Sequence, residues 1–283
     1  MATRRETLVL KTLVSSVDRA CKEYGLSDLR RTLESLVPNI SDQCSGYTLS
    51  ESWSQIVRAR HALQICQVQR AISLLDSTLK LSIVDIGDSS GVHLEYIRAL
   101  NERIRFSTLS INNDEIAVSK IRDKGFPTLK TRIESMHGDP EFIADANIYL
   151  CFETMEHLRD PTTFLHNLAS LTGCEYLVLS VPYVRQSRVG LHQLRSQPGR
   201  VMKAEQRPFN AETTHIFELC PQDWNLLFRF TGWRIVDQFI FTHYPRREAL
   251  SLCRYLWRRL NFDGHYAVVL EPDDSVARLY EDW

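Results

Sequence analysis

The sequence carries no excess of charge of either sign and has little glycine or proline. Its 283 residues include 11 glycines and 10 prolines, and 34 basic residues face 35 acidic ones, for a formal net charge of −1. With 43% hydrophobic and 10% aromatic residues, the composition is that of a folded chain and excludes disorder and collagen-like repeats. The balanced charge disfavours a general grip on a polyanion. A nucleic-acid partner would therefore need a local basic patch.

The sequence also lacks closely paired cysteines and long apolar runs. Its seven cysteines are odd in number and none is spaced as C-x-x-C, which argues against a disulfide framework or a cysteine metal site. Apolar runs such as 176–184 reach about half the length of a membrane helix. Lys11 interrupts the run Leu8–Leu10 before a signal-peptide core forms. We expect a reduced, cytoplasmic protein with no transmembrane segment.

Two periodicities divide the chain. Residues 1–80 show only helical spacing of apolar residues, whereas from residue 81 short β-branched runs alternate with amphipathic segments. We expect strands at 81–86, 105–111, 146–152, 176–182, 233–241 and 265–270, and helices around 93–101, 115–124 and 161–171. This order predicts an α/β fold whose sheet is mostly parallel, with an antiparallel edge made by the last two strands. The expected parts are an N-terminal helical cap (1–80), or an independent helical domain there, a main domain (81–270) and an acidic C-terminal tail (271–283).

The segment after the first expected strand is the most informative one. Residues 83–86 are an apolar run that ends in a turn of small residues, and a helix is expected to open after the turn. Small residues let the backbone approach a ligand closely, and a helix N-terminus offers unpaired N–H groups. The spacing Asp85-x-Gly87-x-Ser89-x-Gly91 resembles the acidic-x-Gly-x-Gly-x-Gly loop of class I S-adenosylmethionine-dependent methyltransferases. Ser89 replaces the middle glycine of that loop.

Four later segments strengthen the resemblance to this family. Asn112 ends the second expected strand, where the family has an acidic residue, and the run 144–153 resembles the family's fourth strand. The run 153–158, Glu-Thr-Met-Glu-His-Leu, resembles the family's Glu-x-x-Glu-His-Leu segment, and 176–182 resembles its fifth strand with a terminal proline. His215-Ile-Phe-Glu-Leu leads on to Gly232-Trp233, much like a late segment of many members. An NAD-binding domain, the main competing interpretation, gives no reason for the Glu-His-Leu and His-Ile-Phe segments.

The resemblance implies a Rossmann-like methyltransferase sheet that binds S-adenosylmethionine. It implies that the methionine part of the cofactor is held by the loop residues Asp85, Gly87, Asp88, Ser89 and Gly91. Asn112 would bind the ribose. Ile133 and Glu134, which follow the third strand region, would contact the adenine by their position alone.

A second cluster of candidate residues follows the fourth strand. Glu153, Glu156 and His157 stand at i, i+3 and i+4, so a helix would place them on one face, and His215 could join them from a loop. The set resembles the Glu-x-x-Glu-His…His metal site of the small-RNA 3′-terminal 2′-O-methyltransferases, and quinone-biosynthesis O-methyltransferases share its first part. A divalent metal held there would acidify the substrate hydroxyl. Alternatively the residues are structural, or His157, His215 or Glu153 acts in catalysis without a metal.

The acceptor is only partly constrained by the sequence. Residues 183–210 carry six basic residues and one acidic residue, Glu205; the basic ones are Arg185, Arg188, Arg195, Arg200, Lys203 and Arg207. They could recognise an anionic acceptor or form a solvated insertion. The segment 246–259 predicts an amphipathic helix with a basic face that could meet a membrane surface, a polyanion or a partner subunit, or simply be exposed. The acidic tail would repel RNA.

We therefore predict transfer of a methyl group from S-adenosylmethionine to an oxygen of a small-molecule or glycan acceptor. Two alternatives stay open at this point. One is an RNA 2′-O-methyltransferase. The other is a catalytically silent scaffold or partner subunit with the same fold, because Ser89 and Asn112 depart from the family's usual residues. The sequence does not indicate the oligomeric state.

Overall fold

A computed structural model describes residues 4–75, 80–142, 145–190, 214–247, 249–259 and 263–280. Its main sheet has seven strands in the order β3-β2-β1-β4-β5-β9-β8. These are β1 (Lys80–Ile86), β2 (Arg105–Asn112), β3 (Thr128–Lys130), β4 (Ile148–Phe152), β5 (Tyr176–Pro182), β8 (Trp233–Thr242) and β9 (Gly264–Pro272). The strands β1 to β5 run parallel, and β9 is antiparallel to both β5 and β8. The predicted parallel sheet with an antiparallel edge is confirmed.

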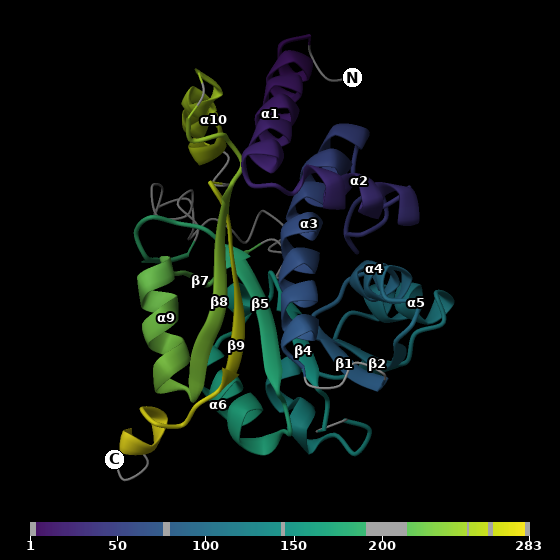
Figure 1. Cartoon of the computed structure of the whole chain (residues 1–283), viewed down its shortest axis with the longest axis vertical. Helices are drawn as coiled ribbons and strands as arrows, with labels where there is room; N and C mark the ends of the chain where they lie inside the picture. Colours follow the sequence, from purple (N-terminus) through teal and green to yellow (C-terminus); the bar gives the residue numbers. More distant parts are fainter. Residues whose placement is uncertain are drawn as a thin grey trace, which may run out of the picture.

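Helices cover both faces of this sheet (Figure 1). The helices that follow the N-terminal ones are α4 (Val92–Leu100), α5 (Glu115–Asp123), α6 (Pro161–Leu171), α9 (Pro221–Phe230) and α10 (Arg254–Arg259). Short 3-10 helices are η1 (Ile133–Gly138), η2 (Met155–His157), η5 (Ala249–Cys253) and η6 (Ala277–Tyr280). The strands β6 (Arg188–Val189) and β7 (Phe217–Glu218) form a small second sheet. The helices predicted at 93–101, 115–124 and 161–171 are present.

Alternate residues of each central strand are buried in two separate clusters, one on each face of the sheet. From β4, Ile148, Leu150 and Phe152 join the cluster that contains α3 and α4, whereas Tyr149 and Cys151 join the cluster that contains α6 and α9. Since both faces are covered, the central strands are mostly apolar and do not alternate regularly with polar residues.

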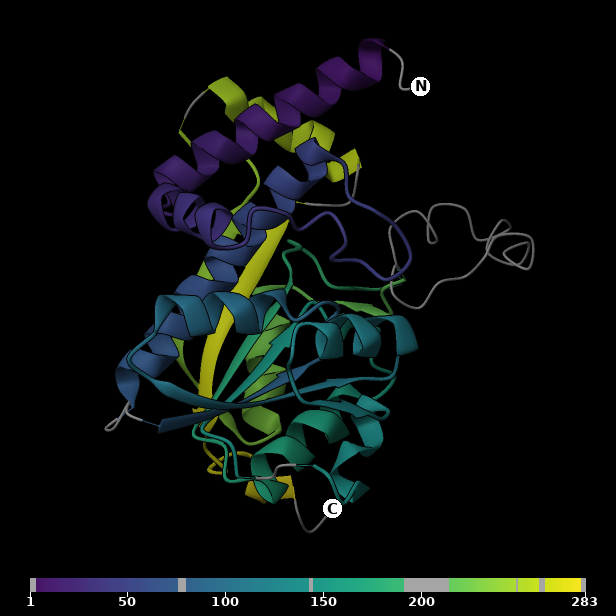
Figure 2. The same cartoon turned by 90° about the vertical axis from the view of Figure 1, so that its right-hand side faces the viewer.

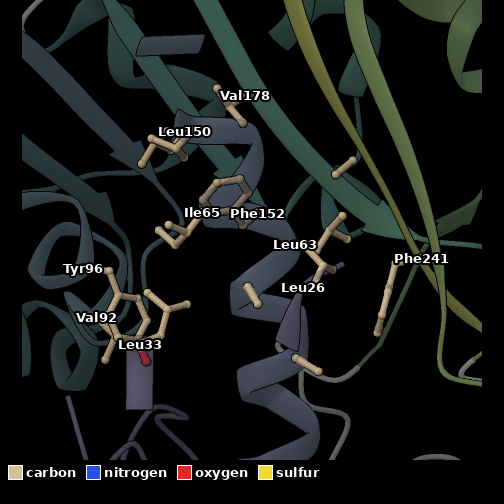
Figure 3. Packing of buried hydrophobic residues seen from close by; sticks show 14 of the residues in the cluster. Leu26, Leu33, Leu63, Ile65, Val92, Tyr96, Leu150, Phe152, Val178 and Phe241 are labelled. Atoms are coloured by element: carbon tan, nitrogen blue, oxygen red, sulfur yellow. The ribbon is translucent and has the colours of Figure 1, made fainter. Parts of the chain in front are cut away.

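The N-terminal residues form α1 (Arg4–Glu23), α2 (Ser27–Leu36) and α3 (Glu51–Leu74). The hydroxyl of Ser50 caps α3 by accepting the N–H of Trp53. Helix α3 lies along the sheet, where Leu63 and Ile65 pack in one cluster with Leu150 and Phe152 of β4 (Figure 3). This helix is therefore a layer of the main core. The division of the chain at residue 80 remains a prediction.

The other two N-terminal helices lie beyond one edge of the sheet, where α1 is close to η5 and α2 is close to α4 (Figure 2). Trp257 of α10 donates its indole N–H to Ser16 of α1 at 2.8 Å. This is the edge at which the parallel strands end, and ligands of open α/β sheets bind at such edges. Among the described residues, no helix combines the length and the apolar character that crossing a lipid bilayer requires.

Candidate active site

A cavity of about 510 Å³ lies at the carboxyl edge of the sheet. Its walls come from the loop after β1, the segment after β4 and the N-terminal residues 43–64. The predicted site residues that line it are Asp85, Gly87, Asp88, Ser89, Glu153, Glu156, His157 and His215. Residues far apart in sequence thus face one space.

The loop after β1 is a tight turn that needs its glycines. Gly87 and Gly91 have φ angles of +82° and +75°, a region that side chains with a Cβ rarely adopt. A Cβ on Gly87 would lie 2.2 Å from Oγ1 of Thr154. The carboxylate of Asp88 closes the turn by accepting the backbone N–H groups of Ser90 at 3.0 Å and Gly91 at 2.8 Å.

Asp85 lies under this turn with 1% of its surface exposed. Its Oδ2 atom has no hydrogen-bond partner in the described part of the chain. Burial, together with the nearby charge of Asp88, raises the pKa of Asp85 well above its ordinary value. A buried acceptor without a donor is costly, so this atom is suited to a ligand that brings a donor.

The other predicted cofactor residues do not line the cavity. The side-chain amide of Asn112 donates to the carbonyl of Asp88 at 2.7 Å and accepts the N–H of Asp114 at 2.8 Å. Ile133 packs against the cluster that contains α6 and α9, and Glu134 lies 3.6 Å from the guanidinium of Arg132. Their contacts with ribose and adenine remain predictions.

The prediction that a helix opens at Glu153 is wrong. Only the single 3-10 turn Met155–His157 forms, and Glu153 precedes it with a left-handed φ of 51°. The reason is that the N–H of Glu153 donates to the carbonyl of Ser180 on β5 at 2.9 Å, which holds the residue against the sheet. Glu153, Glu156 and His157 therefore do not share one helical face.

The carboxylate of Glu153 turns toward the antiparallel edge instead. It accepts the hydroxyl of Ser180 at 2.9 Å, and His265 Nδ1 lies 3.0 Å from its other oxygen. Arg60 of α3 lies 3.8 Å away. Burial alone would raise the pKa of Glu153, but the charges of His265 and Arg60 outweigh it and hold the pKa below its ordinary value.

Three of the four predicted metal residues do lie together. Glu156, His157 and His215 can each offer one ligand atom, all within 4.8 Å of one another. Glu156 is 1% exposed, and both of its carboxylate oxygens lack a hydrogen-bond partner in the described part of the protein. Burial, then the nearby Glu153, raises its pKa well above the ordinary value.

Both histidines of this group use Nδ1 to contact a hydrogen-bond acceptor outside the group. Nδ1 of His157 lies 3.0 Å from the carbonyl oxygen of Thr214, and Nδ1 of His215 lies 2.9 Å from a carboxylate oxygen of Glu218. Since both partners accept, each Nδ1 carries a hydrogen, and in the neutral ring the lone pair is then on Nε2. Arg188 pairs with the second oxygen of Glu218. Outer partners of this kind orient metal-binding histidines in proteins.

Several lining residues were missed by sequence reasoning. They are Arg60 and Gln64 on α3, His93 on α4, and His243 and His265 at the antiparallel edge. A signal existed on α3, where the polar residues Arg58, His61, Gln64 and Gln67 recur every three residues and are all buried. Of the basic residues predicted to meet an acceptor, Arg195, Arg200, Lys203 and Arg207 lie outside the described residues.

The strand order and the flanking helices are those of the class I S-adenosylmethionine-dependent methyltransferase fold. No family model and no curated protein matches the sequence, whereas many solved structures match the fold. A putative sarcosine dimethylglycine methyltransferase from Galdieria sulphuraria has a TM-score of 0.54 at 11% identity, covering 87% of this chain and 99% of that one.

Two further solved structures show how broad this fold is. A chain of the complex between the Haloferax volcanii Trm112 methyltransferase activator and the putative methyltransferase has a TM-score of 0.50 at 13% identity, covering 83% of this chain and 98% of that one. The [4+2]-cyclase SpnF has a TM-score of 0.52 at 9% identity, covering 76% and 82%. Because a cyclase shares the fold, the reaction must be argued from the site.

Proposed function

We propose that the protein transfers a methyl group from S-adenosylmethionine to a hydroxyl oxygen of a small-molecule or glycan acceptor. One observation carries the proposal. The turn formed by Asp85, Gly87 and Asp88 and the group formed by Glu156, His157 and His215 line one cavity. A cofactor at the turn and an acceptor at the group would therefore meet, which is the main requirement of an in-line transfer.

The residues at the turn fit the cofactor. S-adenosylmethionine has a cationic methionine part, and the turn supplies the buried carboxylates of Asp85 and Asp88. When bound, it supplies an electrophilic methyl group. The chain's contribution is to hold the cofactor's methionine part in this turn, whose shape depends on the positive φ of Gly87 and on its tight packing against Thr154.

A divalent cation fits the second group. Glu156 offers a buried carboxylate without a partner, and His157 and His215 offer Nε2 lone pairs. Two imidazoles and one carboxylate with open positions form a common catalytic metal site. When bound, such a cation acts as a Lewis acid on an acceptor hydroxyl. Glu218 and Thr214 keep the two rings oriented for it.

The cavity favours a compact acceptor. Its volume of about 510 Å³ has to hold the cofactor as well, which leaves room inside it for only a small acceptor group. Trp53, Ile56, Val57, Phe152 and Trp257 form an apolar part of its wall. A sugar or aromatic ring with a free hydroxyl would suit this wall. An RNA acceptor or a silent scaffold are the alternatives that the experiment must separate.

The experiment follows transfer of labelled methyl from S-adenosylmethionine, with and without Mn²⁺, into pools of hydroxyl-bearing metabolites, glycans and short RNAs. We expect label in a small-molecule or glycan pool, and its loss in a Gly87→Arg variant. Label confined to RNA would select the RNA alternative. No transfer into any pool, combined with no cofactor binding, would contradict the proposal and leave the scaffold.

The metal part is tested separately by calorimetric titration with Mn²⁺. Glu156→Gln should weaken binding at least about 10-fold, because a neutral amide replaces the anionic ligand. Glu153→Gln is the matched control, since its carboxylate is held by Ser180 and His265. Its charge acts on Glu156 only as a neighbour, so this variant should weaken binding much less than Glu156→Gln does. An equal loss of Mn²⁺ affinity in both variants would indicate that Glu153 is a metal ligand too. If the wild-type protein binds none of Mn²⁺, Mg²⁺ and Zn²⁺, the proposed metal site is refuted.

A further inference from the structure

A chain of hydrogen-bonded, buried polar side chains runs from Glu153 to the turn after β1 (residues 85–91), which is the proposed cofactor site. Ser180 donates to Glu153 Oε1, Gln64 Nε2 lies 2.9 Å from the Ser180 hydroxyl oxygen, and His93 Nε2 lies 2.9 Å from Gln64 Oε1. The chain ends at Asp85, whose Oδ2 lies 3.9 Å from His93 Nδ1. Gln64, His93 and Asp85 all line the cavity.

The direction of every hydrogen bond in this chain follows from its first member. The carboxylate of Glu153 accepts only, so the single hydrogen of Ser180 is used there. Ser180 must then accept from the amide nitrogen of Gln64. This leaves the amide oxygen of Gln64 facing His93, so His93 donates from Nε2. The lone pair of His93 is therefore on Nδ1, the atom that faces Asp85.

Two acceptors consequently face each other without a hydrogen between them. The 3.9 Å separation of His93 Nδ1 and Asp85 Oδ2 is too long for a direct hydrogen bond. One nitrogen could nevertheless lie about 2.9 Å from both atoms, an ordinary hydrogen-bond length. The other acid of the turn, Asp88, already accepts the backbone N–H groups of Ser90 and Gly91 and lies 3.4 Å from the hydroxyl of Ser110.

We propose that His93, in the tautomer fixed by Gln64, forms with Asp85 the acceptor pair for the α-ammonium group of the cofactor's methionine part. His93 then binds the cofactor, and Gln64 is a positioning residue that acts through it. The inference rests on the proposed function, since it assumes a cofactor at this turn. It also makes the N-terminal helix α3 part of the cofactor site.

The protonation tendencies of the pair agree with this arrangement. Burial lowers the pKa of His93 to about 3, so its imidazole is neutral and can accept. Burial raises the pKa of Asp85, and a bound ammonium group would reverse that shift because opposite charge favours the carboxylate.

The first readout needs no cofactor. A long-range ¹H–¹⁵N spectrum of the protein at neutral pH should show His93 as the tautomer with hydrogen on Nε2. Gln64→Leu should change this signal. The matched control is Gln67→Leu on the same helix, because Gln67 is equally buried but lies 3.5 Å from Asp237, away from the cavity. A wild-type signal with hydrogen on Nδ1, or an imidazolium at neutral pH, would overturn the inference.

The second readout is calorimetric binding of two probes, S-adenosylhomocysteine, which has the α-ammonium group, and 5′-methylthioadenosine, which lacks it. His93→Gln keeps an amide group at the position of Nε2 but none at the position of Nδ1. It should weaken the binding of S-adenosylhomocysteine about 10-fold to 100-fold. His93→Asn keeps one near Nδ1 and should restore part of the loss. The affinity for 5′-methylthioadenosine should stay within about two-fold in both variants.

Three results would count against the proposal. Equal weakening of both probes would mean that His93 only shapes the turn. Unchanged probe affinity with loss of Mn²⁺ binding would assign the group Asp85, Asp88 and His93 to a metal instead. Wild-type protein that binds neither probe, with Mn²⁺ binding intact, would overturn the proposed function and this inference with it, whereas the spectrum would still report the tautomer.

Discussion

At the scale of single residues, Gly87 and Glu153 carry the least common backbone conformations of the site. Gly87 has a positive φ and a neighbouring hydroxyl where a Cβ would stand, and Glu153 has a positive φ although it is not a glycine. A positive φ is a strain for Glu153, and strain of this kind gathers at functional sites. In the turn after β1 the glycine at position 87 adopts the same region without that strain.

Replacing Gly87 with alanine tests the fit of the turn. We expect Gly87→Ala to destabilise the protein more than Gly125→Ala does, by about 1–3 kcal/mol. Both glycines have a positive φ, but a Cβ at Gly125 meets nothing within 4 Å, so that variant measures backbone strain alone. Chemical denaturation of the two variants gives the comparison. Equal losses would show that Thr154 moves aside freely.

At the scale of elements, the N-terminal helices are tied to the main domain by buried polar contacts. Arg58 of α3 is 3% exposed and donates to the carbonyls of Leu33 and Pro38 and to the hydroxyl of Tyr96 on α4. Its guanidinium thereby joins α2, α3 and α4. This is a second reason, besides the shared core, why α3 is a layer of the fold.

Removing that guanidinium should be costly. We expect Arg58→Met to lower the free energy of unfolding by about 3 kcal/mol, since it leaves buried acceptors without donors. The control is Arg31→Met on α2, because Arg31 pairs with Asp28 at the exposed surface and such pairs contribute about 0–1 kcal/mol. Thermal or urea unfolding measures both. A loss below about 1 kcal/mol for Arg58→Met would mean that water replaces the guanidinium.

The sequence predicted the elements better than it predicted their contacts. The strands and the helices after residue 81 follow from apolar periodicity, because local spacing determines which faces are buried. The predicted helix at Glu153 does not form, since a backbone hydrogen bond to Ser180 on a neighbouring strand overrides the local pattern. His265 and Gln64 could not be placed by motif either. Their roles come from the antiparallel edge and from α3, which only the tertiary structure brings to the cavity.

At the scale of the whole molecule, buried histidines make stability depend on pH. His61 is fully buried on α3, with neither ring nitrogen hydrogen-bonded among the described residues. Complete burial, the largest cause, lowers its pKa well below the ordinary value. Below about pH 6.5 the unfolded chain binds a proton that the folded protein does not. Stability is therefore lost as the pH falls through this range.

The variant His61→Phe should remove this loss. Phenylalanine keeps the ring contacts with His93 and Tyr96 and has no buried nitrogen to leave unpaired. Relative to wild type, we expect its unfolding free energy to gain about 2 kcal/mol between pH 7.5 and pH 5.0. Urea unfolding at the two pH values measures this gain. His166→Phe at an exposed position of α6 is the control, and an equal gain there would refute the account.

Binding of S-adenosylmethionine in the cavity at the carboxyl edge is the step on which the proposed function depends. It is tested by calorimetric titration of the wild-type protein and of Gly87→Arg with S-adenosylmethionine. We predict one site per chain with a dissociation constant in the micromolar range, and no binding in the variant, whose side chain would collide with Thr154. Absence of binding to the wild-type protein, with or without Mn²⁺, would contradict the account.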